Sequence, residues 1–177
     1  MKTFTFFFIL FLFGCVATSN QTIKTPVNPE EQKLINQISS ENDQIAQKAI
    51  NILGRQDNAS PAIIKKYEAM FKSCNNYDRI EALLDSVYLY NNQSDFLPGL
   101  EICLNSSNED IRDEAIDIIS DIESKKAIDI LIEALANPYP DVRDEARDSL
   151  ETITDKSFDC QPRWKQWWKN NRKNFSF

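Results

Sequence analysis

Histidine is absent from the 177 residues, and glycine occurs only three times and proline only seven. Without histidine, the chain lacks the commonest general base and the commonest transition-metal ligand. Few glycines and prolines disfavour a turn-rich β architecture. Cationic side chains are outnumbered, and the net charge of −7 argues against a nucleic-acid partner, because phosphate neutralisation needs an excess of Lys and Arg.

Motifs that hold metals or perform redox chemistry are missing as well. The four cysteines include no Cys-x-x-Cys pair, so zinc and thioredoxin-type chemistry lack support. No Asp-x-Asp-x-Asp-Gly calcium loop occurs. The sequence therefore predicts no enzyme activity, no cofactor and no metal.

Only one long apolar run is present, and it lies at the N-terminus. It extends from Phe4 to Phe13, behind the single basic residue Lys2. A membrane-spanning helix needs about 20 apolar residues, so this run is too short to span a bilayer. It instead fits the hydrophobic region of a secretory signal peptide.

The end of this run resembles the lipobox of bacterial lipoproteins. In "LFGC", Leu12 to Cys15, a small residue precedes a cysteine, although Phe13 is bulkier than the usual residue. The resemblance implies residues 1–19 as the signal region, lipidation of Cys15 and residues 16–28 as a flexible tether. The protein would then be exported to the bacterial cell envelope, as an outer-membrane lipoprotein or in the periplasm. Ordinary cleavage after Ala17-Thr18-Ser19, with Cys15 discarded, is the alternative.

One ten-residue segment, which we call the repeated phrase, occurs twice in similar form. "DIRDEAIDII" begins at Asp110, and "DVRDEARDSL" begins 31 residues later at Asp141. The same offset places Leu100 on Leu131 in the segments upstream. Five apolar residues in and just after the first copy fall within one arc of about 100° on a helical wheel, as in a helix that faces a core: Ile111, Ala115, Ile118, Ile119 and Ile122. Two helices per period predict an all-α solenoid.

Both copies resemble the second helix of HEAT repeats of the HEAT-like, PBS-lyase type. "DIRDEAIDII" and "DVRDEARDSL" share its apolar-Arg-x-x-Ala-x-x-x-apolar spacing. The resemblance implies about four helical hairpins in residues 29–155, with "ENDQIAQKAINIL" and "YDRIEALLDSVYLY" as two degenerate second helices. The first helices are expected at Pro29–Ser40, Pro61–Cys74, Phe96–Leu104 and Lys125–Ala136. It also implies that the Arg and Asp of the phrase connect neighbouring repeats.

Acidic side chains gather on one side of these second helices. They are Asp110, Asp113, Glu114, Asp117 and Asp121 on the helix of the first copy and Asp141, Asp144, Glu145 and Asp148 on the helix of the second. Stacking would place them in adjacent rows, and rows of one sign attract basic partners. By resemblance, second helices line the groove of the solenoid. An ordinary solvated face, with Arg112, Arg143 and Arg147 nearby, is the alternative.

The C-terminal segment, residues 156–177, breaks the period. Pro162 can begin a helix, and Trp164, Trp167 and Trp168 share one face of it, with Lys165 and Lys169 outside that cluster. A solenoid needs its terminal repeat covered, so we expect a capping helix. Contact of the Trp and Lys residues with the cell envelope or a membrane is the alternative.

Three cysteines follow the signal region: Cys74, Cys103 and Cys160. Cys103 aligns with Ala134 and is expected to be a small buried residue. A Cys74–Cys103 disulfide is an open alternative in an oxidising compartment.

Taken together, these features predict an exported, lipid-anchored scaffold that acts by protein–protein contact through an acidic groove. An envelope-binding module that uses the C-terminal helix is the second hypothesis. An enzyme-associated subunit, as in bilin lyases that carry similar repeats, is disfavoured because that chemistry is cytoplasmic.

Overall fold

The computed structural model describes residues 28–177, so the signal region, the lipobox at Cys15 and nearly all of the tether lie outside the described part. The described residues form nine α-helices, one short 3-10 helix and no strand. The helices are α1 (Pro29–Gln37), α2 (Asp43–Leu53), α3 (Pro61–Ser73), α4 (Tyr77–Val87), α5 (Leu97–Cys103), α6 (Glu109–Asp121), α7 (Lys125–Ala134), α8 (Pro140–Thr154) and α9 (Gln161–Asn171), with η1 (Gln93–Phe96) before α5.

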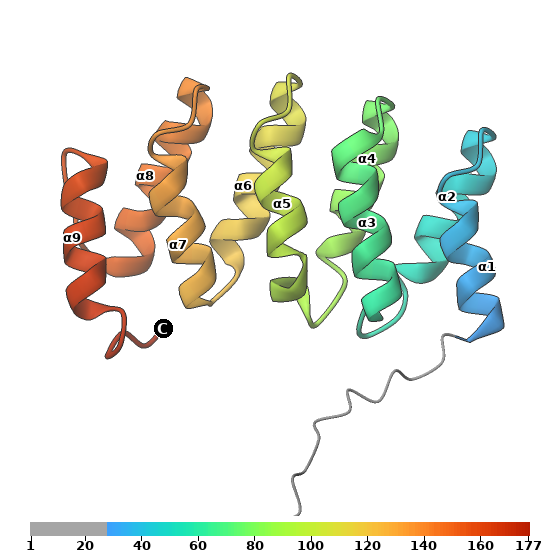
Figure 1. Cartoon of the computed structure of the whole chain (residues 1–177), viewed down its shortest axis with the longest axis horizontal. Helices are drawn as coiled ribbons and strands as arrows, with labels where there is room; N and C mark the ends of the chain where they lie inside the picture. Colours follow the sequence, from blue (N-terminus) through green and yellow to red (C-terminus); the bar gives the residue numbers. More distant parts are fainter. Residues whose placement is uncertain (1–27) are drawn as a thin grey trace, which may run out of the picture.

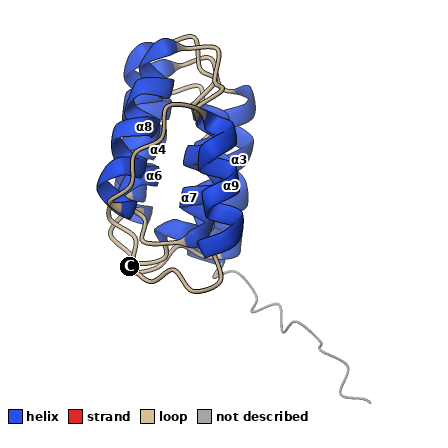
Figure 2. Cartoon of the chain, turned by 90° about the vertical axis from the view of Figure 1, so that its left-hand side faces the viewer, coloured by secondary structure: helices blue, strands red, loops and turns tan. Residues whose placement is uncertain are grey.

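Successive helices pair into four hairpins that stack in a row, and α9 follows the last of them (Figure 1). The odd-numbered helices form one layer and α2, α4, α6 and α8 form the other (Figure 2). We call these the first-helix layer and the second-helix layer. This arrangement confirms the predicted all-α solenoid, including its two degenerate hairpins.

The first helices begin within a residue of the predicted positions and end one to three residues earlier. Most starts are fixed by a capping side chain, as at α6, where Asn108 Oδ1 accepts from the Asp110 backbone nitrogen at 2.8 Å. Proline near the start of α1, α3, α8 and α9 adds a fixed φ at little cost, since the first amide has no helical acceptor.

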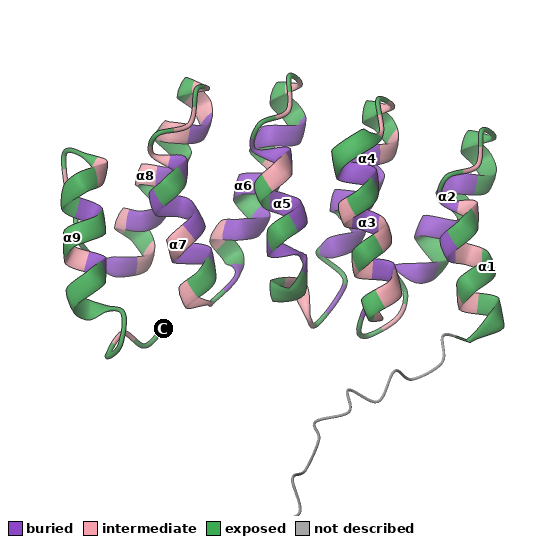
Figure 3. Ribbon diagram, in the orientation of Figure 1, coloured by how far each residue is buried: buried purple, intermediate pink, exposed green. Residues whose placement is uncertain are grey.

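Burial follows the predicted apolar stripe between the two layers (Figure 3). Ile119, Val142 and Leu150 have no exposed surface, and Ile111 is only 3% exposed. The repeated phrase therefore supplies equivalent core contacts in neighbouring hairpins. Close approach of α5 to α3 explains one of the few glycines, because a Cβ at Gly99 would lie 2.9 Å from the Phe71 ring.

The three cysteines of the described region are free thiols. Cys74 and Cys103 border one small cavity but form no disulfide. Cys103 is buried as predicted, and burial raises the pKa of its thiol to about 12, with the Glu114 charge adding to the effect. Cys103 is therefore a packing residue and a poor nucleophile at neutral pH.

Candidate protein-interaction surface

Arg112 joins the third and fourth hairpins from a buried position. Its Nε donates to Asp141 Oδ2 at 2.7 Å, and a second guanidinium nitrogen lies 2.6 Å from the same oxygen. Its Nη1 donates to the Ser106 carbonyl oxygen at 2.9 Å. The Arg and Asp of the repeated phrase thus connect α6 to α8, as the family resemblance implies.

Tyr139 shows a second contact of the same guanidinium. It occupies the cap position of α8 without forming a side-chain cap bond. Instead, the Arg112 Cζ lies 3.9 Å from the centroid of the Tyr139 ring, a cation–π geometry. A residue that caps its own helix poorly is therefore explained by its contact with the preceding repeat.

Carboxylates from three successive second helices lie near one another in the second-helix layer. The charges of Asp85 and Glu81 on α4 help to raise the pKa of Glu114 on α6. In the same way, the charges of Asp117 and Asp113 on α6 help to raise the pKa of Glu145 on α8. We define the acidic face as Glu81, Asp85, Asp113, Glu114, Asp117, Asp121, Glu145 and Asp148. None of these eight forms an ion pair with a cationic side chain of residues 28–177.

The proton affinity of the acidic face reflects this crowding. Burial raises the pKa of Glu114 to about 7, and the neighbouring Asp85 carboxylate adds to the shift. Burial and like charges also raise the pKa of Asp117 and of Glu145 above their ordinary values. The half-exposed Tyr88 beside them has its pKa raised to about 12 by burial and by the same carboxylates. The face is therefore an uncompensated negative field.

Replacing Glu114 with glutamine should make stability less dependent on pH. The folded-state pKa of Glu114 lies above its usual 4.5, so folding binds a proton between pH 4.5 and 7, and this contribution to stability is lost as pH rises through that window. Because the side chain is half exposed, we expect a loss of only about 1 kcal/mol between pH 5 and pH 8 in the wild type. Urea unfolding of Glu114→Gln at the two pH values should show a difference smaller by that amount. The exposed Glu101→Gln serves as the control and should leave it unchanged.

Six of the nine carboxylates predicted from the sequence belong to the acidic face: Asp113, Glu114, Asp117, Asp121, Glu145 and Asp148. The other three have different surroundings. Asp141 is bound by Arg112, and Asp144 pairs with Arg147 of its own helix at 3.0 Å. Asp110 is exposed in the first turn of α6, where it complements the helix dipole.

Sequence reasoning missed Glu81, Asp85 and Tyr88 of α4. Glu81 and Asp85 are four residues apart, as are Asp113 and Asp117 on α6, so the same helical periodicity marks them. The repeat pattern does not identify them, because the α4 segment carries bulky leucines where the pattern has a small residue. The acidic face is consequently one hairpin longer than predicted.

The C-terminal helix α9 covers the outer side of α7 and ends the first-helix layer (Figures 1 and 2). Trp164 has no exposed surface and Trp168 is 5% exposed, whereas Trp167 is only half buried. Trp168 Nε1 donates to Asp129 Oδ1 of α7 at 2.6 Å, and the Arg172 guanidinium contacts the same carboxylate at 2.9 Å. The predicted capping helix is confirmed.

One basic residue of α9 also contributes to the contact between α9 and α7. Lys165 pairs with Glu133 of α7 at 2.8 Å, while Lys169 is exposed. Burial would raise the pKa of Asp129, but the hydrogen bonds from Arg172 and Trp168 outweigh it and hold that pKa below its usual value. Two of the three indoles are thus committed to the core, where they are not available to a membrane or the cell envelope.

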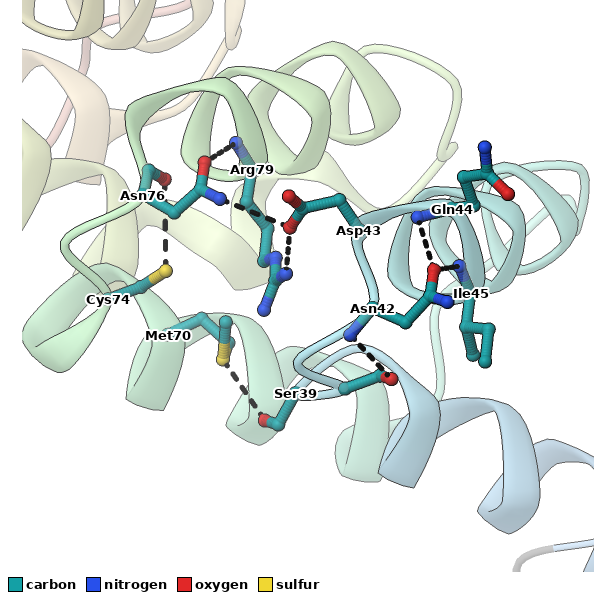
Figure 4. Close-up of polar contacts among 10 residues, drawn as sticks. Ser39, Asn42, Asp43, Gln44, Ile45, Met70, Cys74, Asn76 and Arg79 are labelled. Carbon is teal, nitrogen blue, oxygen red and sulfur yellow. Dashed lines mark hydrogen bonds and ion pairs between the residues drawn. The ribbon is translucent and has the colours of Figure 1, made fainter.

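The first two hairpins are joined by a different polar contact, at the N-terminal ends of α2 and α4 (Figure 4). Asp43 of α2 accepts from Asn76 Nδ2 at 3.2 Å and forms an ion pair with Arg79 of α4. Asn76 also caps α4, because its Oδ1 accepts from the Arg79 backbone nitrogen at 3.1 Å. The charge of Asp43 is therefore balanced within this end of the second-helix layer.

Among residues 28–177, no group of three or more His, Cys, Asp or Glu side chains is arranged to hold a metal ion. Within the same range, no helix combines the length and the apolar character needed to cross a bilayer.

Stacked helical hairpins that share one core define the class of this protein as an α-solenoid. Comparison with protein families finds a match to HEAT repeats over residues 31–151. The chain therefore belongs to the HEAT repeat family, whose members are commonly scaffolds for protein–protein interaction. No match was found among curated proteins.

Proposed function

We propose that this protein is an exported, lipid-anchored, non-catalytic HEAT-repeat scaffold that binds a basic protein partner through the acidic face. The single observation that carries the proposal is the lack of any cationic partner for the eight carboxylates of that face within residues 28–177. Like charges held together destabilise the free protein, and a basic partner would relieve that repulsion.

The shape of the face fits an extended protein segment. Glu81 and Asp85 lie on α4, Asp113 and Asp117 on α6, and Asp148 on α8, so negative charge crosses three stacked helices. Neighbouring helices pack about 8–10 Å apart, so the charge extends over roughly 20 Å. A chain of about six extended residues covers that length.

Anchoring at the membrane rests on the lipobox resemblance at Leu12–Cys15. Lipidation of Cys15 would tether the repeat domain to a bilayer through residues 16–28. Incorporation of a labelled fatty acid by the wild-type chain, and its loss in Cys15→Ser, tests this part of the proposal separately from partner binding.

Neutralising part of the acidic face should weaken binding of a lysine-rich peptide by about tenfold or more. Asp113→Asn, Asp117→Asn and Asp148→Asn together remove three charges, each worth roughly 0.5 kcal/mol at a surface. Fluorescence anisotropy with a labelled peptide of alternating lysine and glycine measures the affinity. Binding by the wild type should weaken at high salt, and it should strengthen from pH 5.5 to pH 8 as Glu114 loses its proton.

The matched control removes three exposed carboxylates outside the acidic face: Glu41→Gln, Asp57→Asn and Glu101→Gln. Net charge then changes equally in both variants, so a general charge effect would weaken both to the same extent. Equal affinities of the two variants would refute the acidic face as the binding site. Circular dichroism confirms that both remain folded.

A further inference from the structure

A groove lies along the seam of α2 and α4, at the end of the second-helix layer farthest from α8. It consists of two cavities of about 680 and 230 Å³. Both are bordered by Gln47, Asn51 and Arg55, so they form one continuous groove. The exposed apolar side chains Ile52 and Leu89 border it as well.

The groove differs in charge from the acidic face. It is lined by the cations Lys48, Arg55 and Arg79. Arg79 is balanced by Asp43, but within residues 28–177 neither Lys48 nor Arg55 forms an ion pair. The remaining anion at the larger cavity, Asp78, lies in the first turn of α4 and complements the helix dipole there.

The groove and the acidic face meet at one residue. Asp85 borders the smaller cavity together with Arg55, and it also interacts with Glu114 on α6. Within residues 28–177, the second-helix layer therefore presents two cations without an ion pair at α2, Lys48 and Arg55, and carboxylates without an ion pair from α4 to α8. A uniformly basic partner would be attracted by α6 and α8 but repelled by Lys48 and Arg55.

We propose that the α2–α4 groove binds an acidic segment of the same protein partner whose basic segment lies on the acidic face. This inference rests on the proposed function. The partner segment is then held in one direction, with its carboxylates near Lys48 and Arg55 and its cations over α6 and α8. Complementary charge at both ends rejects the reversed orientation, because reversal places like charges together.

The distance between α2 and α8 in the stack sets the length of peptide that can reach both the groove and the acidic face. Three steps of about 8–10 Å separate α2 from α8. An extended peptide of about nine residues covers this distance. We therefore use twelve-residue labelled peptides as probes: one with lysines in one half and serine and glycine in the other, and one in which the neutral half carries glutamates instead.

Anisotropy titrations of the full chain with both peptides test the proposal. We expect the bipolar peptide to bind about three- to tenfold more tightly than the basic peptide. In Lys48→Gln with Arg55→Gln, this advantage should disappear while the basic peptide binds at least as well. Lys33→Gln with Lys65→Gln removes two exposed cations from the first-helix layer and should preserve the advantage.

Orientation gives an independent readout. A nitroxide on the acidic end of the bipolar peptide should broaden the NMR signals of α2, and one on the basic end should broaden those of α8. Equal affinity of the two peptides, or equal broadening of both helices from either end, would overturn the inference while leaving the proposed function intact. Failure of both peptides to bind would defeat both. If the double variant instead changes the sedimentation coefficient and the bipolar peptide has no advantage, the groove contacts a second copy of this chain.

Discussion

Arg112→Ala should lower the free energy of unfolding by about 2–4 kcal/mol, because it leaves several partly buried groups without partners. The Arg112 side chain is 7% exposed and that of Asp141 is 23% exposed, so the remaining carboxylate would lose its counter-charge in a poorly hydrated place. The Ser106 carbonyl oxygen and the Tyr139 ring would lose their contacts too. Urea unfolding followed by circular dichroism at pH 7 measures the change.

Two controls separate this contact from ordinary surface charge. Arg147→Ala removes a cation whose pair with Asp144 is exposed on both sides, and it should cost less than about 0.5 kcal/mol. Arg112→Met combined with Asp141→Leu should recover much of the stability, because replacing both partners leaves no isolated charge. If Arg112→Ala and Arg147→Ala cost the same, the contact between α6 and α8 does not stabilise the solenoid.

Loss of this contact should also change how the protein unfolds. In a solenoid each repeat touches only its neighbours, so a weakened interface between the third and fourth hairpins can divide the chain into two units. We therefore expect a smaller dependence of the unfolding free energy on urea for Arg112→Ala, or two separate transitions.

The repeated phrase could be predicted from the sequence because its function is local and periodic. The stripe that contains Ile111, Ile119, Val142 and Leu150 obeys helical spacing, and the structure buries all four residues. Helix starts could be predicted equally well, since Asn108 and Pro140 act within the first turn of their own helices. Features of this kind need no knowledge of distant contacts.

Contacts between repeats were harder to predict. Tyr139 is unexplained within α8 because its partner, Arg112, belongs to the previous hairpin. The contribution of Glu81 and Asp85 to the acidic face depends on how α4 stacks against α6, which a helical wheel for one helix cannot show. The groove between α2 and α4 was missed for the same reason, because Lys48 and Arg79 meet only when the two hairpins stack.

The three tryptophans of α9 illustrate an intermediate case. Their spacing of three and four residues predicts one common face, and the structure confirms that this face packs on α7. Periodicity did not show that Trp167 would be less buried than Trp164 and Trp168. Trp167 packs instead against the rings of Phe158 and Phe175, which lie outside α7.

Trp164→Ala should lower the free energy of unfolding by about 3–5 kcal/mol, the usual cost of emptying a large aromatic site in a core. Trp164 is fully buried, and its ring meets Phe158 edge to face at a centroid distance of 4.9 Å. Removing it would leave a cavity at the end of the first-helix layer and loosen α9 from α7. Thermal and urea unfolding measure the loss, and Trp167→Ala, at a half-buried position, should cost only roughly 1–2 kcal/mol.

A third substitution tests the same site without emptying it. The Trp164 Nε1 atom is buried without a hydrogen-bond partner among residues 28–177, so Trp164→Phe loses ring volume but also removes an unsatisfied donor. It should therefore cost clearly less than Trp164→Ala.

Binding of the full chain to anionic vesicles distinguishes a cap from a membrane contact. If Trp164→Ala abolished vesicle binding while stability stayed at the wild-type value, the ring would act at a membrane surface, and its role in closing the solenoid would be disproved.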